Sequence, residues 1–151
     1  MTLMGEHRVH LAIRNELADL ALLSDALEQF CVRHGVTSKT RGQLQVALDE
    51  IVSNIIKYAW PDRGAHKIEL FISAVTDGIK LELVDDGQAF DPLAVKAPAQ
   101  PSAGSRPRPG GLGLHMVHQL VDGIDYVRRR GRNHTILTKQ CAVSVSSRRS
   151  R

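Results

Sequence analysis

The chain has 151 residues, of which 42% are hydrophobic and 24% charged, and its formal net charge at pH 7 is +4. These values are ordinary for one soluble globular domain with a sizeable core. No apolar run approaches the roughly 20 residues that span a bilayer, and the N-terminus lacks the apolar stretch of a secretion signal. We therefore expect a cytoplasmic protein that makes no membrane contact.

The cysteines and histidines do not form a recognisable ligand set. Cys31 and Cys141 are far apart and form no CxxC pair, so we expect two reduced thiols in a reducing compartment. His115 and His118 have a spacing that suits a metal, but no further ligands accompany them. A metal site built from protein side chains alone is therefore not expected.

The excess positive charge lies in two short tracts, residues 128–132 ("RRRGR") and the tail at 148–151. A nucleic-acid surface is one interpretation. The other is a solvated strand edge followed by a disordered tail, which is the usual behaviour of such charge blocks. One Trp, two Tyr and three Phe leave few side chains on which bases could stack. We favour the second interpretation and expect no direct nucleic-acid partner.

The first part of the chain predicts a strand and two helices. Polar and apolar residues alternate over His7–Ile13, which is typical of a half-buried strand. Helical spacing follows from about residue 16 to residue 34, where Gly35 is a candidate C-cap. A second helix begins at a Thr37 or Ser38 cap and runs to about residue 59, just before a proline.

The second part predicts two hairpins separated by a loop and a helix. Strand patterns cover Lys67–Val75 and Ile79–Asp86, with the turn signal "TDG" between them. Residues 97–111 are rich in Pro, Gly and Ser, so we expect a mobile loop. A helix then starts at about residue 112. Two last strands, residues 123–130 and 134–143, form a hairpin around "GRN".

This order of elements predicts an α+β two-layer sandwich. The order is strand, helix, helix, strand, strand, loop, helix, strand, strand. Two hairpins imply a largely antiparallel sheet with the helices gathered on one face. The order differs from the strand–helix alternation of a Rossmann fold.

The second helix carries a carboxylate and an amide on an otherwise apolar pattern. Glu50 and Asn54 lie four residues apart in "LDEIVSNIIKYAW", so they share one helix face and can reach one small target. A solvated polar edge is the alternative explanation of such a pair.

Two later stretches also combine polar groups with glycine. "VDDGQAFDP" (residues 84–92) closes an apolar strand with carboxylates that can accept hydrogen bonds from a ligand's amino group. An ordinary Asp-Gly turn is the alternative. "GGLGL" (residues 110–114) opens a helix, where backbone N–H groups and a partial positive charge suit a phosphate. A simple hinge is the alternative there.

Together, the three motifs resemble the nucleotide-binding boxes of the GHKL superfamily. "DEIVSNIIKYAW" resembles the N box, "DDGQAFDP" the first glycine box and "GGLGLHMV" the second. Within that superfamily the chain is most similar to bacterial anti-sigma-factor serine/threonine kinases, over about residues 7–141. The resemblance implies the Bergerat (histidine-kinase-like ATPase) fold, with a mixed, mostly antiparallel sheet. It also implies ATP and Mg²⁺ as cofactors.

The resemblance also implies an organisation along the chain. Residues 1–143 would form a single ATP-binding kinase domain, followed by a basic, disordered tail at 144–151. Residues 97–111 would be the ATP lid, with Arg106 and Arg108 able to reach the phosphates when it closes.

Residue roles follow position by position from the resemblance. Glu50 would be the general base for a serine hydroxyl, and Asn54 would hold Mg²⁺ through its side-chain oxygen. Lys57 would either approach the phosphates or be a solvated lysine. Asp85 would accept from the adenine amino group, with Asp86 as a less favoured alternative, and Gly87 lies beside it.

The remaining implied contacts lie later in the chain. Gly111, Leu112, Gly113 and Leu114 would line the phosphates through their backbone, and Thr138 on the last strand would reach the adenine region. The usual second glycine of the first glycine box is alanine here, a departure that serine-kinase members often share.

The implied function is that of an ATP-dependent protein serine kinase and anti-sigma factor. Such a protein binds a sigma factor and phosphorylates a serine of a STAS-type anti-anti-sigma partner, and homodimers are common among its relatives. The alternative is a non-catalytic, ATP-sensing binding module, from which Glu50 could have been lost. A sensor histidine kinase is disfavoured, because the sequence has no room for a phosphoacceptor helical hairpin.

Overall fold

The computed structural model describes residues 2–3, 7–94 and 111–144. These residues form six strands, three α-helices and two short 3-10 helices. In chain order they are β1 (Thr2–Leu3), β2 (Arg8–Arg14), η1 (Leu17–Asp19), α1 (Leu20–Arg33), α2 (Ser38–Tyr58), β3 (Lys67–Val75), β4 (Gly78–Asp85), η2 (Pro92–Ala94), α3 (Gly111–Leu120), β5 (Gly123–Arg129) and β6 (Arg132–Gln140).

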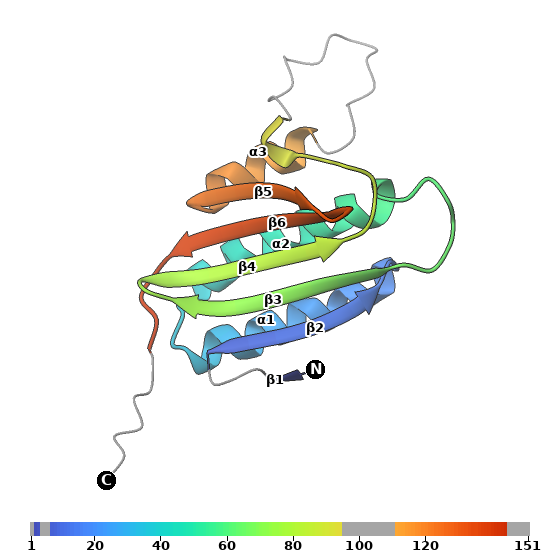
Figure 1. The fold of residues 1–151 in the computed structure, drawn as a ribbon. Helices are drawn as coiled ribbons and strands as arrows, with labels where there is room; N and C mark the ends of the chain where they lie inside the picture. Colours follow the sequence, from blue (N-terminus) through green and yellow to red (C-terminus); the bar gives the residue numbers. More distant parts are fainter. Residues whose placement is uncertain (1, 4–6, 95–110, 145–151) are drawn as a thin grey trace.

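The strands form one sheet, and the helices lie behind it in a second layer (Figure 1). The strand order is β1-β2-β3-β4-β6-β5. The predicted α+β two-layer sandwich is thus confirmed. The sheet is not mixed, however, since every strand pair in the described part of the chain is antiparallel. Hairpins account for the β3–β4 and β5–β6 pairs, while β2 and β3 pair antiparallel although α1 and α2 lie between them in the chain.

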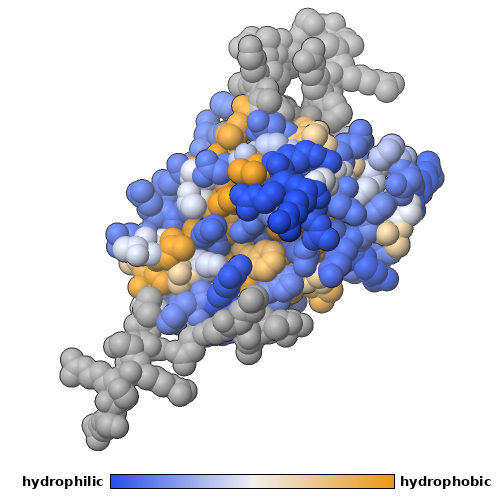
Figure 2. Space-filling model, in the orientation of Figure 1, coloured by the Kyte–Doolittle hydropathy of each residue, from blue (hydrophilic) through white to orange (hydrophobic). Residues whose placement is uncertain are grey.

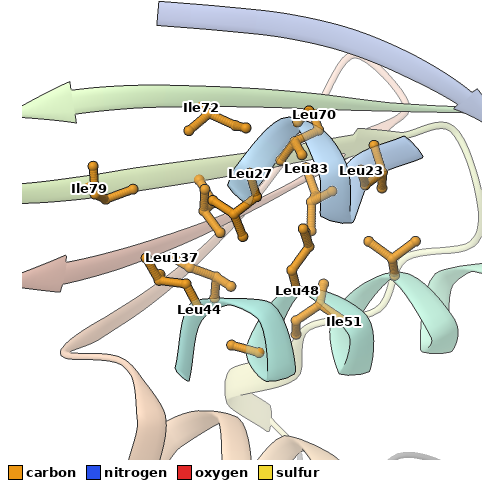
Figure 3. Packing of buried hydrophobic residues seen from close by; sticks show 14 of the residues in the cluster. Leu23, Leu27, Leu44, Leu48, Ile51, Leu70, Ile72, Ile79, Leu83 and Leu137 are labelled. Atoms are coloured by element: carbon orange, nitrogen blue, oxygen red, sulfur yellow. The ribbon is translucent and has the colours of Figure 1, made fainter. Parts of the chain in front are cut away.

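A continuous hydrophobic core joins the sheet to α1 and α2 (Figure 3). Alternate residues of the central strands point toward the helices, as the period-2 pattern predicts. Leu70 and Leu83 meet Leu27 of α1 and Leu48 of α2, and all four side chains are fully buried. Burying one such side chain stabilises the fold by roughly 1.5–3 kcal/mol. This packing fixes the apolar side of α2, and therefore also where its polar edge lies.

The helix ends follow the expected capping chemistry. The side-chain oxygen of Thr37 accepts a hydrogen bond from the backbone N–H of Thr40 at 3.3 Å, so Thr37 rather than Ser38 is the N-cap of α2. Gly35 follows α1 with a φ of +69°, a conformation that glycine adopts without steric cost. Residues 17–19 form a 3-10 turn, so α1 begins later than predicted.

The β5–β6 turn differs from the prediction. Arg130 and Gly131 have φ values of 52° and 73° and form a two-residue turn. Asn133, which was expected in the turn, is therefore part of β6 and faces Asp85 of β4 across the sheet. This shift in register brings a buried amide to the end of β4.

The described helices do not cover the second face of the sheet (Figure 1), which faces the viewer in the space-filling view of Figure 2. It is largely hydrophilic, with apolar side chains between the charged ones. Glu69 forms a hydrogen bond with His10 at 3.1 Å and an ion pair with Arg132 at 3.4 Å, and Glu82 forms a hydrogen bond with His134 at 3.0 Å. One arginine of the basic tract is thus matched by a carboxylate. None of the described helices is long and apolar enough to cross a membrane.

Candidate functional site

A pocket of about 460 Å³, including its open part, lies where α2, α3 and β6 approach the end of β4. Its lining is mostly apolar with a few polar groups, which is typical of small-ligand sites. The lining residues are Ile51, Asn54, Ile55, Tyr58, Ala59, Asp85, Gln88, Phe90, Pro92, Leu114, Asn133 and Thr135.

Asp85 is the buried carboxylate of this pocket. It is the last residue of β4 and only 4% exposed. Its Oδ1 accepts hydrogen bonds from the backbone N–H of Gly87 at 2.9 Å and from Nδ2 of Asn133 at 3.0 Å. Burial raises the pKa of Asp85, while these two hydrogen bonds oppose the rise. Among the described residues, Oδ2 has no hydrogen-bond partner, so it is the oxygen left for a ligand.

Asn133 ties the β5–β6 hairpin to the loop after β4. It is 3% exposed, and its Nδ2 also donates to the carbonyl of Gln88 at 2.7 Å and, more weakly, to that of Gly87 at 3.4 Å. The sequence interpretation missed this residue, because it placed Asn133 in the turn. The signal was the alternation of Asn133, Thr135 and Leu137 after the two-residue turn.

Two residues of β5 hold the other end of the Asn133 amide. Its Oδ1 accepts from the Tyr126 hydroxyl and from the Arg128 guanidinium, the latter at 2.9 Å. Arg128 also donates to the carbonyl of Gly87 at 3.0 Å. One arginine of the basic tract, although exposed on the edge strand β5, therefore also contacts the site.

The loop after Asp85 packs against the C-terminal end of α2. A Cβ atom added to Gly87 would collide with the side chain and carbonyl of Ala59, and the N–H of Gln88 donates to that carbonyl at 2.7 Å. Trp60 donates through its indole nitrogen to Asp86 at 3.0 Å. Glycine at position 87 is thus required by the close approach of two backbones.

Glu50 and Asn54 lie on the edge of α2 that faces α3. A Cβ atom on Gly113 would meet the Glu50 carboxylate, so these two residues are in direct contact. Nδ2 of Asn54 donates to the backbone carbonyl of Glu50 at 2.8 Å. This bond points the Asn54 side chain back along the helix and leaves its Oδ1 available. Asn54 lines the pocket together with Asp85.

The other predicted site residues lie on α3, apart from Lys57 on α2 and Thr138 on β6. Leu114 is buried and lines the pocket, and Gly111 and Leu112 open α3. Lys57 is exposed and does not line the pocket.

The structure does not bring Thr138 to the pocket. Alternate side chains of a strand point to opposite faces, and Thr138 pairs with Lys80 on the face away from the helices. Thr135, three residues earlier, lines the pocket instead. The expected lid lies outside the described residues apart from Gly111, and both of its arginines fall there too.

The oxygen atoms beside the pocket suit an Mg²⁺ ion that would be bound in part by the protein and in part by a nucleotide. Over the described parts of the chain, no cluster of three or more His, Cys, Asp or Glu side chains could hold a metal. The Asn54 oxygen is a hard ligand beside the pocket. Mg²⁺ commonly uses one or two protein oxygens together with phosphate and water, so these residues fit the ion as a companion of a nucleotide.

A model of the histidine kinase-like ATPase domain matches residues 13–139. The chain belongs to this family. The match covers most of the chain and includes all three motifs, and it confirms the resemblance recognised in them.

Curated proteins that are similar to this chain are named as serine kinases. The serine/threonine-protein kinase BtrW of Bordetella bronchiseptica is 28% identical over 116 residues, 77% of this chain and 82% of that protein. The serine-protein kinase RsbW of Oceanobacillus iheyensis is 27% identical over 96 residues, 61% of this chain and 61% of that protein. The matched segment thus spans less than two thirds of the Oceanobacillus protein.

Two solved structures share the fold. The RsbU and RsbW domains of Rv1364c from Mycobacterium tuberculosis align with a TM-score of 0.63 at 16% identity, over 93% of this chain and 34% of that one. The histidine kinase domain of a blue-light activated kinase from Erythrobacter litoralis aligns with a TM-score of 0.53 at 19% identity, over 82% and 59%. At these identities the structures support the fold alone.

Proposed function

We propose that the chain is an ATP-dependent protein serine kinase and anti-sigma factor. The observation that carries the proposal is that Asn54 and Asp85, from distant motifs, line one pocket, while the Glu50 carboxylate touches α3 at Gly113 beside it. A carboxylate for the base, an amide for the metal and a catalytic carboxylate would thereby be gathered around one ligand. The names of the relatives BtrW and RsbW support the same activity.

Adenine would bind at the buried end of the pocket. The free Oδ2 of Asp85 accepts a hydrogen bond from the 6-amino group. Ile55, Phe90 and Leu114 supply apolar surface for the faces of the base.

The phosphates would lie toward the first turn of α3. Gly111–Leu114 present backbone N–H groups there, with the partial positive charge of a helix N-terminus. The oxygen of Asn54 would hold Mg²⁺, which neutralises phosphate charge during transfer. The contact between Gly113 and Glu50 would put the phosphate end of the site next to the proposed base.

Glu50 would receive the proton of the substrate hydroxyl. The serine oxygen forms a bond to the γ-phosphorus, the bond between that phosphorus and the ADP oxygen breaks, and the proton passes to the carboxylate. Glu50 is half-buried at the side of the pocket, so a serine on a partner's surface can approach it from solvent.

The proposed partners are a sigma factor and a STAS-type anti-anti-sigma protein. Phosphorylation of the STAS protein would release it and return the kinase to the sigma factor. The chain would thus act both as a catalyst and as a binding switch.

The test is phosphotransfer from ATP to candidate STAS proteins of the same genome, read by mass shift and phosphosite mapping. Glu50→Gln should bind ADP with little change but form no phosphoserine, and Asn54→Ala should lose the Mg²⁺ dependence of ATP binding. ATP binding without phosphoserine on any partner would instead support the non-catalytic sensing module. If ATP does not bind with Mg²⁺ present, both versions of the function are wrong.

A further inference from the structure

The Asn133 side chain connects β5, the other strand of its hairpin, to the end of β4 and the loop after it, which lie much earlier in the sequence. We propose that Asn133, held by Tyr126 and Arg128, is a positioning residue that aims Asp85 at the ligand and so determines the choice of purine. This inference rests on the proposed nucleotide binding and goes beyond it, because none of these three residues belongs to the motifs that suggested that function.

The orientation of the Asn133 amide is determined by its neighbours. Its nitrogen faces only acceptors, namely Asp85 Oδ1 and the carbonyls of Gly87 and Gln88. Its oxygen faces only donors, from Tyr126 and Arg128. Exchanging nitrogen and oxygen would set the Asn133 oxygen against the Asp85 carboxylate and the Gln88 carbonyl and its nitrogen against the Arg128 guanidinium, and each buried polar group left without a partner costs about 1–3 kcal/mol. The buried amide therefore has one orientation.

This orientation determines which oxygen of Asp85 meets the ligand. Oδ1 already accepts from Asn133 and Gly87, so Oδ2 is the acceptor that faces the pocket. An ionised carboxylate accepts hydrogen bonds and donates none. It therefore favours adenine, which presents a 6-amino donor, and disfavours hypoxanthine, which presents a 6-oxo acceptor.

The charges around Asp85 determine how easily it becomes protonated. Burial raises the pKa of Asp85, the neighbouring Asp86 raises it further, and Arg128 of β5 lowers it. On the opposite face of the sheet, Lys67, Glu69 and Arg132 line a hollow that also includes Asp85 and Asp86. A new negative charge at position 133 would lie inside this arrangement, in hydrogen-bond reach of Asp85.

Asn133→Asp is the sharpest test, because it keeps the shape of the side chain and exchanges its donors for an acceptor. Affinities for ADP and inosine diphosphate are measured by calorimetry between pH 5.5 and 8.5. We expect ADP affinity at pH 7.5 to fall about tenfold or more, the change that one pKa unit represents. Inosine diphosphate affinity should change less than about threefold. The pH at which ADP affinity is half lost should move upward.

Two further variants separate positioning from folding. Tyr126→Phe removes only the hydroxyl that braces Asn133, and ADP affinity should fall about threefold, the effect of one modest hydrogen bond, with inosine diphosphate unchanged. If Asn133→Asp does not fold, the two affinities of Tyr126→Phe test the positioning role instead. His134→Gln is the matched control, since His134 is on the other face of β6, paired with Glu82, and neither affinity should change.

The outcomes distinguish this inference from the function on which it rests. Equal losses for both nucleotides, or no loss in either variant, would overturn the positioning role while nucleotide binding stands. If the wild-type protein binds neither nucleotide, the proposed function fails and the positioning role fails with it.

Discussion

The Glu50 carboxylate occupies the space that a Cβ atom on Gly113 would need. Gly113 belongs to the glycine-rich stretch that opens α3, where glycine suits a phosphate site. The structure adds a second reason for glycine here. The proposed catalytic carboxylate comes from α2 and packs directly on the α3 backbone, so the base and the phosphate end are coupled by van der Waals contact.

Gly113→Ala should therefore displace Glu50. We expect phosphotransfer to fall about tenfold or more, because small misplacements of a catalytic group are costly, while ADP affinity falls less. Single-turnover phosphotransfer and calorimetry measure the two effects. Gly42→Ala is the matched control within a helix: nothing lies within 4 Å of its added Cβ, so it should stabilise the fold by up to about 1 kcal/mol and leave catalysis unchanged. Equal behaviour of the two variants would contradict the coupling.

Gly87→Ala should detach the loop after β4 from α2. The new methyl group meets Ala59, and the hydrogen bond from Gln88 to the Ala59 carbonyl lengthens or breaks. Overpacking of this kind typically costs about 1–3 kcal/mol. Urea unfolding should show that loss, and ADP binding should weaken in parallel. An unchanged unfolding midpoint would mean that the loop adapts without strain.

Asp85→Asn should weaken ADP binding and raise the stability of the fold. Burial raises the pKa of Asp85 in the folded state above its value in the unfolded state. At pH values between these two pKa values the folded state binds more protons than the unfolded state, so this group's contribution to stability is lost as the pH rises. The uncharged variant should be more stable than wild type at pH 7 and should bind ADP about tenfold or more weakly, through loss of a charged hydrogen bond. Urea unfolding at pH 5 and pH 8 checks the sign, since the stability gain should be larger at pH 8.

The single tryptophan should report nucleotide binding. Trp60 is hydrogen-bonded to Asp86 and stacked on His66, with ring centroids 4.5 Å apart, and it adjoins the Asp85–Gly87 turn. A ligand that contacts Asp85 should change the environment of the indole, and an ADP titration should give a saturable change in fluorescence. Asp85→Asn should shift that titration to higher ADP concentration. If the fluorescence titration gives a dissociation constant that differs from the one measured by calorimetry, Trp60 does not report ADP binding at Asp85.

The two thiols should differ sharply in reactivity. Cys31 is fully buried in the core, and burial raises the pKa of its thiol to about 12. Cys141 is partly exposed, and burial raises its pKa as well. Because the thiolate is the reactive form, a thiol reagent at pH 8 should modify Cys141 slowly and Cys31 only after unfolding. Peptide mapping identifies the modified residue, and rapid modification of Cys31 would indicate local opening of α1.

Local patterns were sufficient for the elements and for most of the site. The apolar periodicities predicted all three helices and the five longer strands, because each period reflects the face that a helix or strand buries. The family resemblance named Asp85, Asn54 and Leu114, which the fold brings to one pocket. These residues belong to three short motifs, on β4, α2 and α3, that are recognisable in the sequence even though their elements are far apart in the chain.

Contacts between elements were decided by the tertiary structure alone. Asn133 reaches Asp85 because a two-residue turn at Arg130 and Gly131 sets the register of β6, and a shift of one residue would turn its side chain to the other face. The same alternation places Thr135 rather than Thr138 in the pocket.

The sequence by itself thus determined the fold class, the family and the polar edge of α2, since each depends on residues close together in the chain. The tertiary structure decided that Asn133, itself bonded by Arg128, holds Asp85 and that Gly113 makes room for Glu50. Those relationships join β4 to β5 and β6, and α2 to α3, and they depend on strand register and helix packing, which no local pattern encodes.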